Sequence, residues 1–397
     1  MTAAVPVAGV RLGTAAAEIR YRDRDDLLVI ELAPGSVAAA VFTRNAFCAA
    51  PVTVARRHLA ECEPRLLLVN AGNANAGTGR AGLDAANATC AIAAAAAGCL
   101  AEEVLPFSTG VIGEPLPVAR FESGVPQALS ALAAEGWEAG ARAIMTTDTV
   151  PKAVSRTVTH EGVCYTVTGI AKGAGMIRPD MATMLAFLAT DAPLTRSEAG
   201  ALLTAAVAPT LNRVTVDGDT STNDACVLVA TGGAGGGPLP AAFLDGPLRE
   251  ALTGVCEALA RAIARDGEGA SRLVIVQVRG GRDDEECTRV AFTVAESPLV
   301  KTALYAADPN WGRILAAVGR SGVEGLDIDR VGLALGPHAV LTKGQPDPAY
   351  RERDAAAYLA GEEVEIDIDL GRGAASARVF TCDFSEAYVR INADYRS

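Results

Sequence analysis

The stretch KGAGMIRPDMATMLAFLATD, from Lys172 to Asp191, combines residue types that could together carry out acyl transfer. Flexible glycines and a lysine precede the Ala182–Thr183 bond, and an apolar segment follows it. A threonine inside a chain is a poor nucleophile, but once the bond before it is cut its freed α-amine can act as general base. That amine has an ordinary pKa of about 7.7–8.0, which suits proton transfer near neutral pH. Most internal Ala-Thr pairs are only structural, so this chemistry needs support from the rest of the chain.

Other patterns of catalytic or metal-binding residues do not occur in the sequence. The only histidines are His58, His160 and His338, and none of them is near this stretch in the chain. Nine cysteines include no C-x-x-C pair, which argues against a zinc site and against a secreted disulfide framework. The segment DGDTSTND at 217–224 is similar to a calcium loop, but its sixth position is Thr222 instead of glycine. We therefore expect an Asx-rich turn there, no metal and no bound cofactor.

The composition indicates a protein with sizeable cores and an acidic surface. Half of the 397 residues are hydrophobic and only 5% are aromatic, which suffices for two or three domains without metals or disulfides. A formal charge of −12 argues against general nucleic-acid binding. The N-terminus lacks the pattern of a signal peptide, and the most membrane-like stretch, 90–101, is too short to span a bilayer. We expect a cytoplasmic protein that binds neither membranes nor nucleic acids.

Hydrophobic periodicity predicts the elements that must position the chemistry. Short apolar or alternating runs predict strands at 27–32, 66–69, 163–167, 273–278 and 364–370. The last run is followed by GRG and ARVF, which predicts a hairpin. Helical spacing predicts helices at 85–101, 126–145, 196–208 and 247–265. Strands and helices on this spacing favour a layered α+β fold over a Rossmann sheet, with the glycine-rich run 231–240 as a loop or linker.

The segment KGAGMIRPDMATML resembles the cleavage and nucleophile segment of the ornithine acetyltransferase family, the glutamate N-acetyltransferases of arginine biosynthesis. The similarity extends from about residue 9 to the C-terminus in family order. It is carried by GVRLGTAAAEIRYRDRDDLLVIEL, AAVFTRNAFCAAPV, NAGNANAGTG, STGVIGEPLP, AIMTTDT, VDGDTSTND, RDGEGA, SPLVKTALYAADPNWGRILAAVG and YVRINADYRS.

The resemblance implies an α+β fold of the ornithine acetyltransferase type that is N-terminal-nucleophile-like and cuts itself in two. The cut would fall between Ala182 and Thr183, leaving an α chain of residues 1–182 and a β chain of residues 183–397 that begins with the nucleophile. Two such chains of each kind would form an α2β2 heterotetramer.

The family's oxyanion-hole pair falls on Thr109 and Gly110 of the STG segment. A hydroxyl and a backbone N–H can stabilise the developing tetrahedral oxygen, although STG alone would be taken for a polar turn. The substrate contacts implied by the resemblance are Thr146, Lys172, Thr183, Glu268, Asn392 and Ser397. Without the resemblance, Lys172 and Glu268 would be expected to be solvated surface charges.

The implied reaction is a ping-pong transfer of acetyl from N2-acetyl-ornithine to glutamate. Thr183 attacks the amide, ornithine leaves, and the amine of glutamate then takes the acetyl group. The sequence leaves open whether acetyl-CoA is a second donor. Two other functions stay open on the residues alone, a self-cleaving aminopeptidase or amidase of related fold and a non-catalytic homologue.

Two segments depart from the family pattern. Asp180 stands where the family often has asparagine, and this carboxylate could alter the rate of cleavage. Residues 336–357 match no family segment. Neither departure touches the nucleophile or the oxyanion pair.

Overall fold

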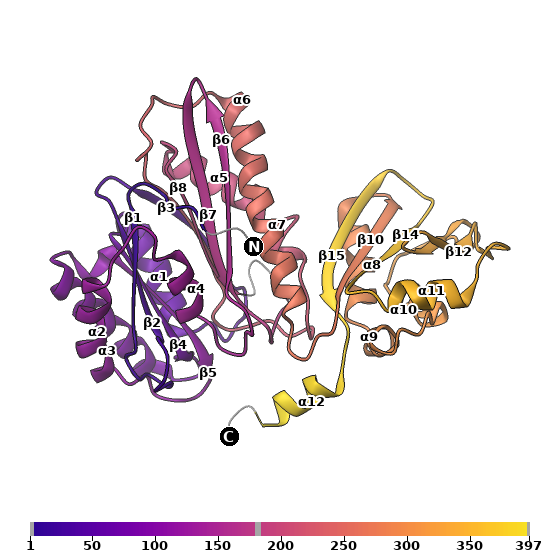
Figure 1. Ribbon diagram of the computed structural model, residues 1–397, viewed down its shortest axis with the longest axis horizontal. Helices are drawn as coiled ribbons and strands as arrows, with labels where there is room; N and C mark the ends of the chain where they lie inside the picture. Colours follow the sequence, from indigo (N-terminus) through magenta and orange to yellow (C-terminus); the bar gives the residue numbers. More distant parts are fainter. Residues whose placement is uncertain (1–3, 179–183, 395–397) are drawn as a thin grey trace. The chain divides into compact units, whose positions relative to one another are not determined.

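The computed structural model describes residues 4–178 and 184–394, which form two compact units (Figure 1). The described parts of the first unit are 4–173, 184–212 and 220–259, and those of the second are 174–178, 213–219 and 260–394. The predicted cut between Ala182 and Thr183 lies outside the described residues. Both units contain residues from the two sides of this cut, so the units differ from the predicted chains.

A four-stranded sheet of the first unit has three helices on one face. Its strands follow the order β1 (Val10–Ala15), β2 (Leu27–Leu32), β4 (Leu66–Asn73) and β5 (Val104–Val111). Only β4 and β5 are parallel. The helices are α1 (Ala50–Glu61), α2 (Gly79–Ala97) and α3 (Ala119–Ser130), and they lie together beside this sheet (Figure 1). Val54, Cys90 and Val125 from these helices share one buried cluster with Leu27 and Leu68 of the sheet.

A five-stranded sheet of the first unit is covered by other helices. Its strands follow the order β3 (Val37–Phe42), β9 (Ala225–Ala230), β8 (Leu185–Thr190), β7 (Val163–Lys172) and β6 (Lys152–His160). The helices of this part are α4 (Trp137–Ala143), α5 (Arg196–Val207), the short α6 (Ala241–Phe243) and α7 (Arg249–Arg265). Gly169 of β7 lets α7 approach closely, because a Cβ atom there would lie 3.0 Å from Val255 and 3.1 Å from Leu259.

The two sheets of the first unit pack face to face. Their apolar side chains form one cluster, in which the rings of Phe107 and Phe187 meet edge to face with centroids 5.1 Å apart. Helices cover the outer faces, so the unit has four layers, helix, sheet, sheet and helix. The layered α+β prediction is confirmed. No helix among the described residues is long and apolar enough to cross a membrane.

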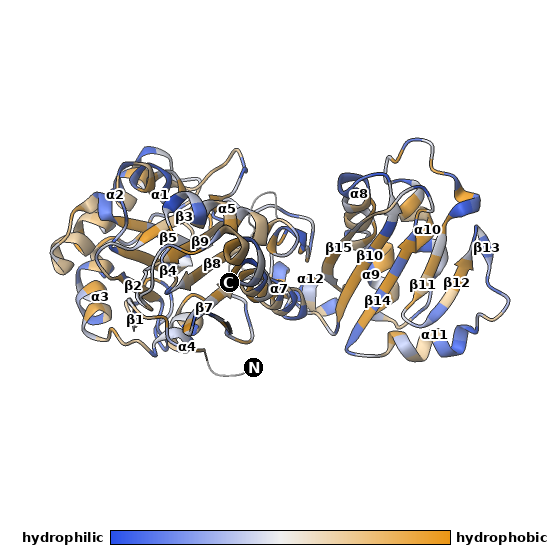
Figure 2. Cartoon of the chain, turned by 90° about the horizontal axis from the view of Figure 1, so that it is seen from above, coloured by the Kyte–Doolittle hydropathy of each residue, from blue (hydrophilic) through white to orange (hydrophobic). Residues whose placement is uncertain are grey.

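The second unit is a six-stranded sheet with helices packed on it. The strand order is β13 (Gln345–Pro346), β12 (His338–Thr342), β11 (Gly332–Leu335), β14 (Glu363–Asp369), β10 (Leu273–Gly281) and β15 (Ala375–Cys382). Its helices are α8 (Asp284–Ala295), α9 (Pro298–Tyr305), α10 (Trp311–Gly319), α11 (Glu352–Leu359) and α12 (Glu386–Ala393). Val364, Ile366 and Ile368 of β14 are fully buried and alternate with partly exposed carboxylates, as their period of two predicts. Figure 2 shows β10 as a mainly hydrophobic strand and β14 with hydrophobic and hydrophilic residues in alternation.

The predicted hairpin near the C-terminus is wrong. β14 and β15 are not neighbours, because β10 lies between them, parallel to β14 and antiparallel to β15. The apolar strand β10, which lies far from β14 and β15 in sequence, pairs with both of them and separates them. A local turn signal could not predict this insertion.

The single helix predicted at 126–145 is also wrong, because the chain forms α3 and α4 with a break between them. At the break, Ala133 exchanges two backbone hydrogen bonds with Leu12 of the edge strand β1, at 2.9 and 3.0 Å. Gly136 lies so close to this strand that a Cβ atom would stand 2.3 Å from the carbonyl oxygen of Leu12. Pairing with the sheet edge therefore replaces helical hydrogen bonds here.

The remaining element predictions hold, with shifted ends. The helix predicted at 85–101 begins at Gly79 and ends at Ala97, because Gly98 adopts a left-handed conformation with φ of 70°. The glycine-rich run 231–240 is a loop, but it joins β9 to α6 inside the first unit. It does not link the two units.

Candidate functional site

Three strand ends in the five-stranded sheet form one row. Lys172 at the end of β7 is the register partner of Leu185 at the start of β8, and Leu185 is the partner of Ala225 at the start of β9. The backbone N–H of Ala225 donates to the carbonyl of Met184 at 2.9 Å. Thr183 precedes Met184 in the chain and lies outside the described residues. This row therefore holds both the candidate substrate lysine and the residue that follows the candidate nucleophile.

Asp148 connects two of the predicted substrate residues. Its Oδ1 accepts from Lys152 Nζ at 2.8 Å and from the backbone N–H of Gly173, next to Lys172, at 2.7 Å. Its Oδ2 accepts from the backbone N–H of Thr146 at 3.1 Å. The side chains of Asp148 and Lys152 are completely buried. Thr146 and the Lys172 backbone are thus held around one carboxylate that the sequence analysis did not identify.

The surroundings of Asp148 keep it ionised. Burial alone would raise the pKa of its carboxyl, but Lys172, Lys152 and the hydrogen bonds from Gly173 and Lys152 together lower the pKa to about 2. Lys172 itself is only 8% exposed, so it is not the solvated surface charge expected from residue type alone.

Asp224 is a second buried carboxyl that interacts electrostatically with Lys172. Burial raises its pKa well above the ordinary value, although hydrogen bonds from Ser221 and the charge of Lys172 act in the opposite direction. Its Oδ2 has no hydrogen-bond partner among the described residues. Burial therefore opposes ionisation of Asp224, whereas the lysines and donors around Asp148 favour its ionised form. A lysine beside a carboxyl that resists ionisation suits an anionic group of a substrate.

The predicted oxyanion pair lies at the end of β5. Thr109 is 8% exposed and pairs with Ala71 of β4. Gly110 has φ of 132°, and a Cβ atom there would stand 2.2 Å from the carbonyl carbon of Gly72. Only glycine fits this position. The STG segment is therefore the end of a buried strand and not a polar surface turn.

Asn223 links this strand end to the start of β9. Its Nδ2 donates to the carbonyl of Ser108 at 2.9 Å and to that of Ala74 at 2.6 Å. The first bond fixes the peptide group that ends in the Thr109 N–H. Asn223 immediately precedes Asp224, so one short segment contacts the surroundings of both Thr109 and Lys172. Sequence reasoning assigned this segment to a turn, although two polar residues directly before an apolar strand could have indicated a site.

The second unit holds the other two described candidates together. Glu268 is 7% exposed, and its Oε2 accepts from Asn392 Nδ2 of α12 at 2.7 Å. Gly175 packs on this carboxylate so closely that a Cβ atom would lie 2.4 Å from Glu268 Oε1. Glu268 is therefore not a solvated surface charge, and Asn392 is anchored. Ser397 lies outside the described residues.

The three histidines have partners elsewhere in the fold. His58 Nδ1 lies 2.8 Å from the carbonyl of Val104, and the ring of His160 lies 4.6 Å from that of Phe243. His338 is on β12 of the second unit, and its ring lies 6.0 Å from that of Tyr358. The hydrogen bonds given above for Asp148, Asn223 and Glu268 have other partners than histidine. That the base is the α-amine of Thr183 and not an imidazole stays a prediction.

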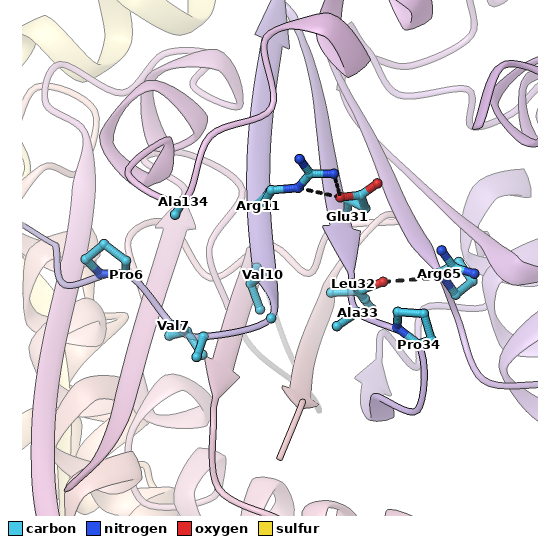
Figure 3. A pocket seen from close by; sticks show the side chains of 12 residues that line it. Pro6, Val7, Val10, Arg11, Glu31, Leu32, Ala33, Pro34, Arg65 and Ala134 are labelled. Carbon is cyan, nitrogen blue, oxygen red and sulfur yellow. Dashed lines mark hydrogen bonds and ion pairs between the residues drawn. The ribbon is translucent and has the colours of Figure 1, made fainter. Parts of the chain in front are cut away.

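A cavity of about 620 Å3 in the first unit is lined by residues of the N-terminal segment and of β1 and β2 (Figure 3). Pro6, Val10 and Pro34 are among its apolar lining residues. At its edge Arg11 Nε donates to Glu31 Oε2 at 2.7 Å across the β1–β2 ladder. None of the candidate residues lines this cavity, and we assign it no part in the chemistry.

Four layers around two face-to-face sheets are the architecture of an N-terminal-nucleophile-like enzyme, and a hydroxyl beside a glycine N–H suits acyl transfer. The protein is an acyltransferase. The model of the ArgJ family matches residues 11–397 of the chain.

Curated relatives agree with this match. The arginine biosynthesis bifunctional protein ArgJ of Methylococcus capsulatus is 53% identical over 394 residues, covering 99% of this chain and 96% of that protein. The protein of the same name from Pseudomonas fluorescens is 51% identical, covering 99% of this chain and 97% of that one. A crystal structure of the ArgJ protein from Bacillus halodurans has a TM-score of 0.50 at 42% identity, covering 52% of this chain and 97% of the solved chain. The chain belongs to the ArgJ family, whose enzymes act in arginine biosynthesis.

Proposed function

We propose that this enzyme transfers the acetyl group of N2-acetyl-ornithine to glutamate through an acetyl ester on Thr183. The observation that supports this most is the row of strand ends, where Lys172 lies beside Leu185, two residues after Thr183 in the chain. Asn223 connects this row to the strand end that carries Thr109 and Gly110. A cation for a carboxylate and donors for an oxyanion thus occur next to the start of the β chain.

The steps of this reaction balance in atoms and electrons. No energy source is needed. The Thr183 hydroxyl attacks the acetyl carbonyl, its proton passes to the α-amine, and the oxygen of the tetrahedral intermediate is held by the Thr109 hydroxyl and the Gly110 N–H. The C–N bond then breaks, and ornithine leaves with the proton. The amine of glutamate attacks the ester in the reverse sequence and gives N-acetylglutamate. Water has to be excluded from the ester, because hydrolysis would release acetate.

Lys172 and Glu268 have opposite proposed roles in binding. The ammonium group of Lys172 favours the carboxylate that both substrates possess. Glu268, held by Asn392, offers an anion to a substrate ammonium group. Thr146, whose backbone is bonded to Asp148, and Ser397 are the remaining proposed contacts.

The enzyme is proposed to mature by a cut between Ala182 and Thr183. The length of the solved Bacillus halodurans chain supports this, because 52% of the present chain covers 97% of it. A chain of about half length is what one cut near the middle would produce. The α chain of residues 1–182 and the β chain of residues 183–397 would remain together, and two such pairs would form an α2β2 heterotetramer in the cytoplasm.

Product analysis tests this function against its rival. The purified protein is incubated with N2-acetyl-ornithine, with and without glutamate, and both acetate and N-acetylglutamate are measured. Transfer predicts N-acetylglutamate with little acetate when glutamate is present. Acetate formation at the same rate with and without glutamate would instead identify an amidase.

The same assay with acetyl-CoA as donor tests a second activity. The relatives are named bifunctional proteins, which supports acetyl-CoA as an additional acetyl donor to glutamate. N-acetylglutamate formed from acetyl-CoA alone would establish it. No product from acetyl-CoA, with normal transfer from acetyl-ornithine, would identify a monofunctional enzyme.

A further inference from the structure

The five residues Ala174–Arg178 form the last described segment before the predicted cut, and contacts within the second unit hold them. The carbonyl of Ala174 accepts from the backbone N–H of Glu268 at 2.8 Å. Arg178 Nε donates to Glu296 Oε1 at 2.8 Å, and its guanidinium lies 4.5 Å from the centre of the Phe292 ring. Both ends of the segment are therefore anchored.

Asp217 accepts hydrogen bonds from the middle of this segment on both carboxylate oxygens. Its Oδ2 accepts from the backbone N–H of Met176 at 2.6 Å, and its Oδ1 accepts from that of Ile177 at 2.9 Å. The carbonyl of Ile177 accepts in turn from the backbone N–H of Val216 at 2.8 Å. Three hydrogen bonds with the adjacent residues Val216 and Asp217 thus fix three consecutive peptide groups, and we call this arrangement the Asp217 clamp.

The clamp holds a conformation that the chain would not adopt readily by itself. Met176 has φ of 54°, in the left-handed region that residues with a side chain seldom occupy. Its side chain is 41% exposed, so packing of the side chain does not explain this conformation. The two N–H groups converge on one carboxylate, and we infer that this carboxylate offsets the backbone strain.

We propose that Asp217 is a positioning residue for the self-cleavage, an inference that rests on the proposed maturation of the enzyme. The cut requires the Thr183 hydroxyl to reach the carbonyl of the preceding residue in a near-attack arrangement. On the other side of the cut, Met184 is held by the N–H of Ala225. Both flanks of the cut are therefore held, and loss of the clamp would release the earlier flank.

Substitution of Asp217 should therefore slow the cut without abolishing it. Displacement of reacting groups by about 1 Å can lower a rate by about 10²-fold, so we expect cutting to slow by at least about 10-fold in Asp217→Asn. An asparagine keeps the shape of the side chain but offers one acceptor oxygen to two N–H groups. Asp217→Glu restores two acceptor oxygens and should cut at an intermediate rate.

Two matched pairs of variants make the test specific. Asp219→Asn removes the same charge two residues further on, where the side chain is exposed. Met176→Pro removes the donor N–H and also excludes the positive φ of Met176, so it breaks the clamp from the other side, whereas Met176→Ala keeps the N–H. The full chain is synthesised in a cell-free system, and cut and uncut masses are followed over time, with thermal unfolding as a check on folding.

The expected result is slow cutting in Asp217→Asn and Met176→Pro, and rates within about twofold of the wild type in Asp219→Asn and Met176→Ala. The double variant Asp217→Asn, Met176→Pro should cut no more slowly than the slower single variant, because both break the same clamp. Wild-type cutting rates in both clamp variants, or equal slowing in Asp217→Asn and Asp219→Asn, would overturn the inference. If Asp217→Asn does not fold, Asp217→Glu decides, because a wild-type cutting rate in that variant would overturn the inference. A wild-type chain that is never cut would refute the proposed maturation itself.

Discussion

Two buried aspartates interact with Lys172, and their surroundings are opposite. Asp148 accepts hydrogen bonds on both oxygens and adjoins two lysines, so its pKa falls to about 2 despite burial. Asp224 is equally buried, but its Oδ2 has no partner among the described residues, and its pKa is raised well above the ordinary value. Burial alone therefore does not determine the charge of an aspartate. The number of donors and cations around each oxygen decides it.

The difference has a chemical consequence for Lys172. Asp148 is the ionised partner of Lys152, whereas burial opposes a second negative charge on Asp224 beside Lys172. We therefore expect Lys172 to attract a substrate carboxylate. If both aspartates were ionised, this end of the sheet would be neutral overall and its attraction for anions would be lost.

The largest effect, on the free energy of unfolding, is expected from Asp148→Asn, which removes the ionised one of the two aspartates. Removing one partner of a buried ion pair leaves Lys152 as an uncompensated charge, at a cost of about 3–5 kcal/mol. The lowered pKa means that Asp148 stabilises the fold fully above about pH 4 and that this contribution is lost as the pH falls towards 2. Chemical denaturation at pH 7 and at progressively lower pH should show a deficit that shrinks with acid.

The exposed Asp245→Asn is the matched control and should change stability by less than about 0.5 kcal/mol. A similar small change in Asp148→Asn at pH 7 would mean that the buried pair contributes little to the free energy of unfolding. Asp148 would then not be the ionised, stabilising partner of Lys152.

The next largest effect, on kcat, is expected from Thr109→Ala, which removes the proposed oxyanion donor and leaves both aspartates in place. Loss of one such donor lowers kcat by about 10²–10³-fold. Thr109→Ser keeps a hydroxyl and should retain most of the activity. Steady-state transfer kinetics decide the role, because a raised KM with unchanged kcat would assign Thr109 to substrate binding.

The smallest effect, again on the free energy of unfolding, is expected from Asp224→Asn, which tests the aspartate whose pKa is raised. Asparagine resembles the neutral carboxyl, so the stability at pH 7 should be unchanged or raised by no more than about 1 kcal/mol. A raised folded pKa means that the wild type loses stability as the pH rises above the unfolded value of about 3.9. The advantage of Asp224→Asn should therefore shrink as the pH falls towards 4. A loss as large as that of Asp148→Asn would show that Asp224 is ionised.

The sequence predicted the parts of the site that depend on local pattern or on resemblance. An alternating run located the strand β7, although it was predicted to end at 167 and continues to Lys172, and the family pattern indicated Lys172 and Thr109. The strands that begin at Leu185 and Ala225 were not predicted. Asn223 could not be identified, because its hydrogen bond to Ser108 joins residues 115 positions apart. Asp148 escaped notice for a similar reason, since Gly173 is brought to it only by the folding of β6 and β7. The hairpin prediction failed because β10 comes from elsewhere in the chain.

The intact mass of the purified protein, before and after incubation with N2-acetyl-ornithine, tests the central claim most directly. We expect two chains that result from a cut between Ala182 and Thr183. The chain that begins with Thr183 should gain the mass of one acetyl group, and added glutamate should remove it. Thr183→Ala should be neither cut nor acetylated, whereas Thr183→Ser keeps a hydroxyl and should be both. A single uncut mass in an active wild-type enzyme, or transfer to glutamate by an enzyme whose β chain never carries acetyl when glutamate is withheld, would contradict the proposed acetyl-threonine mechanism.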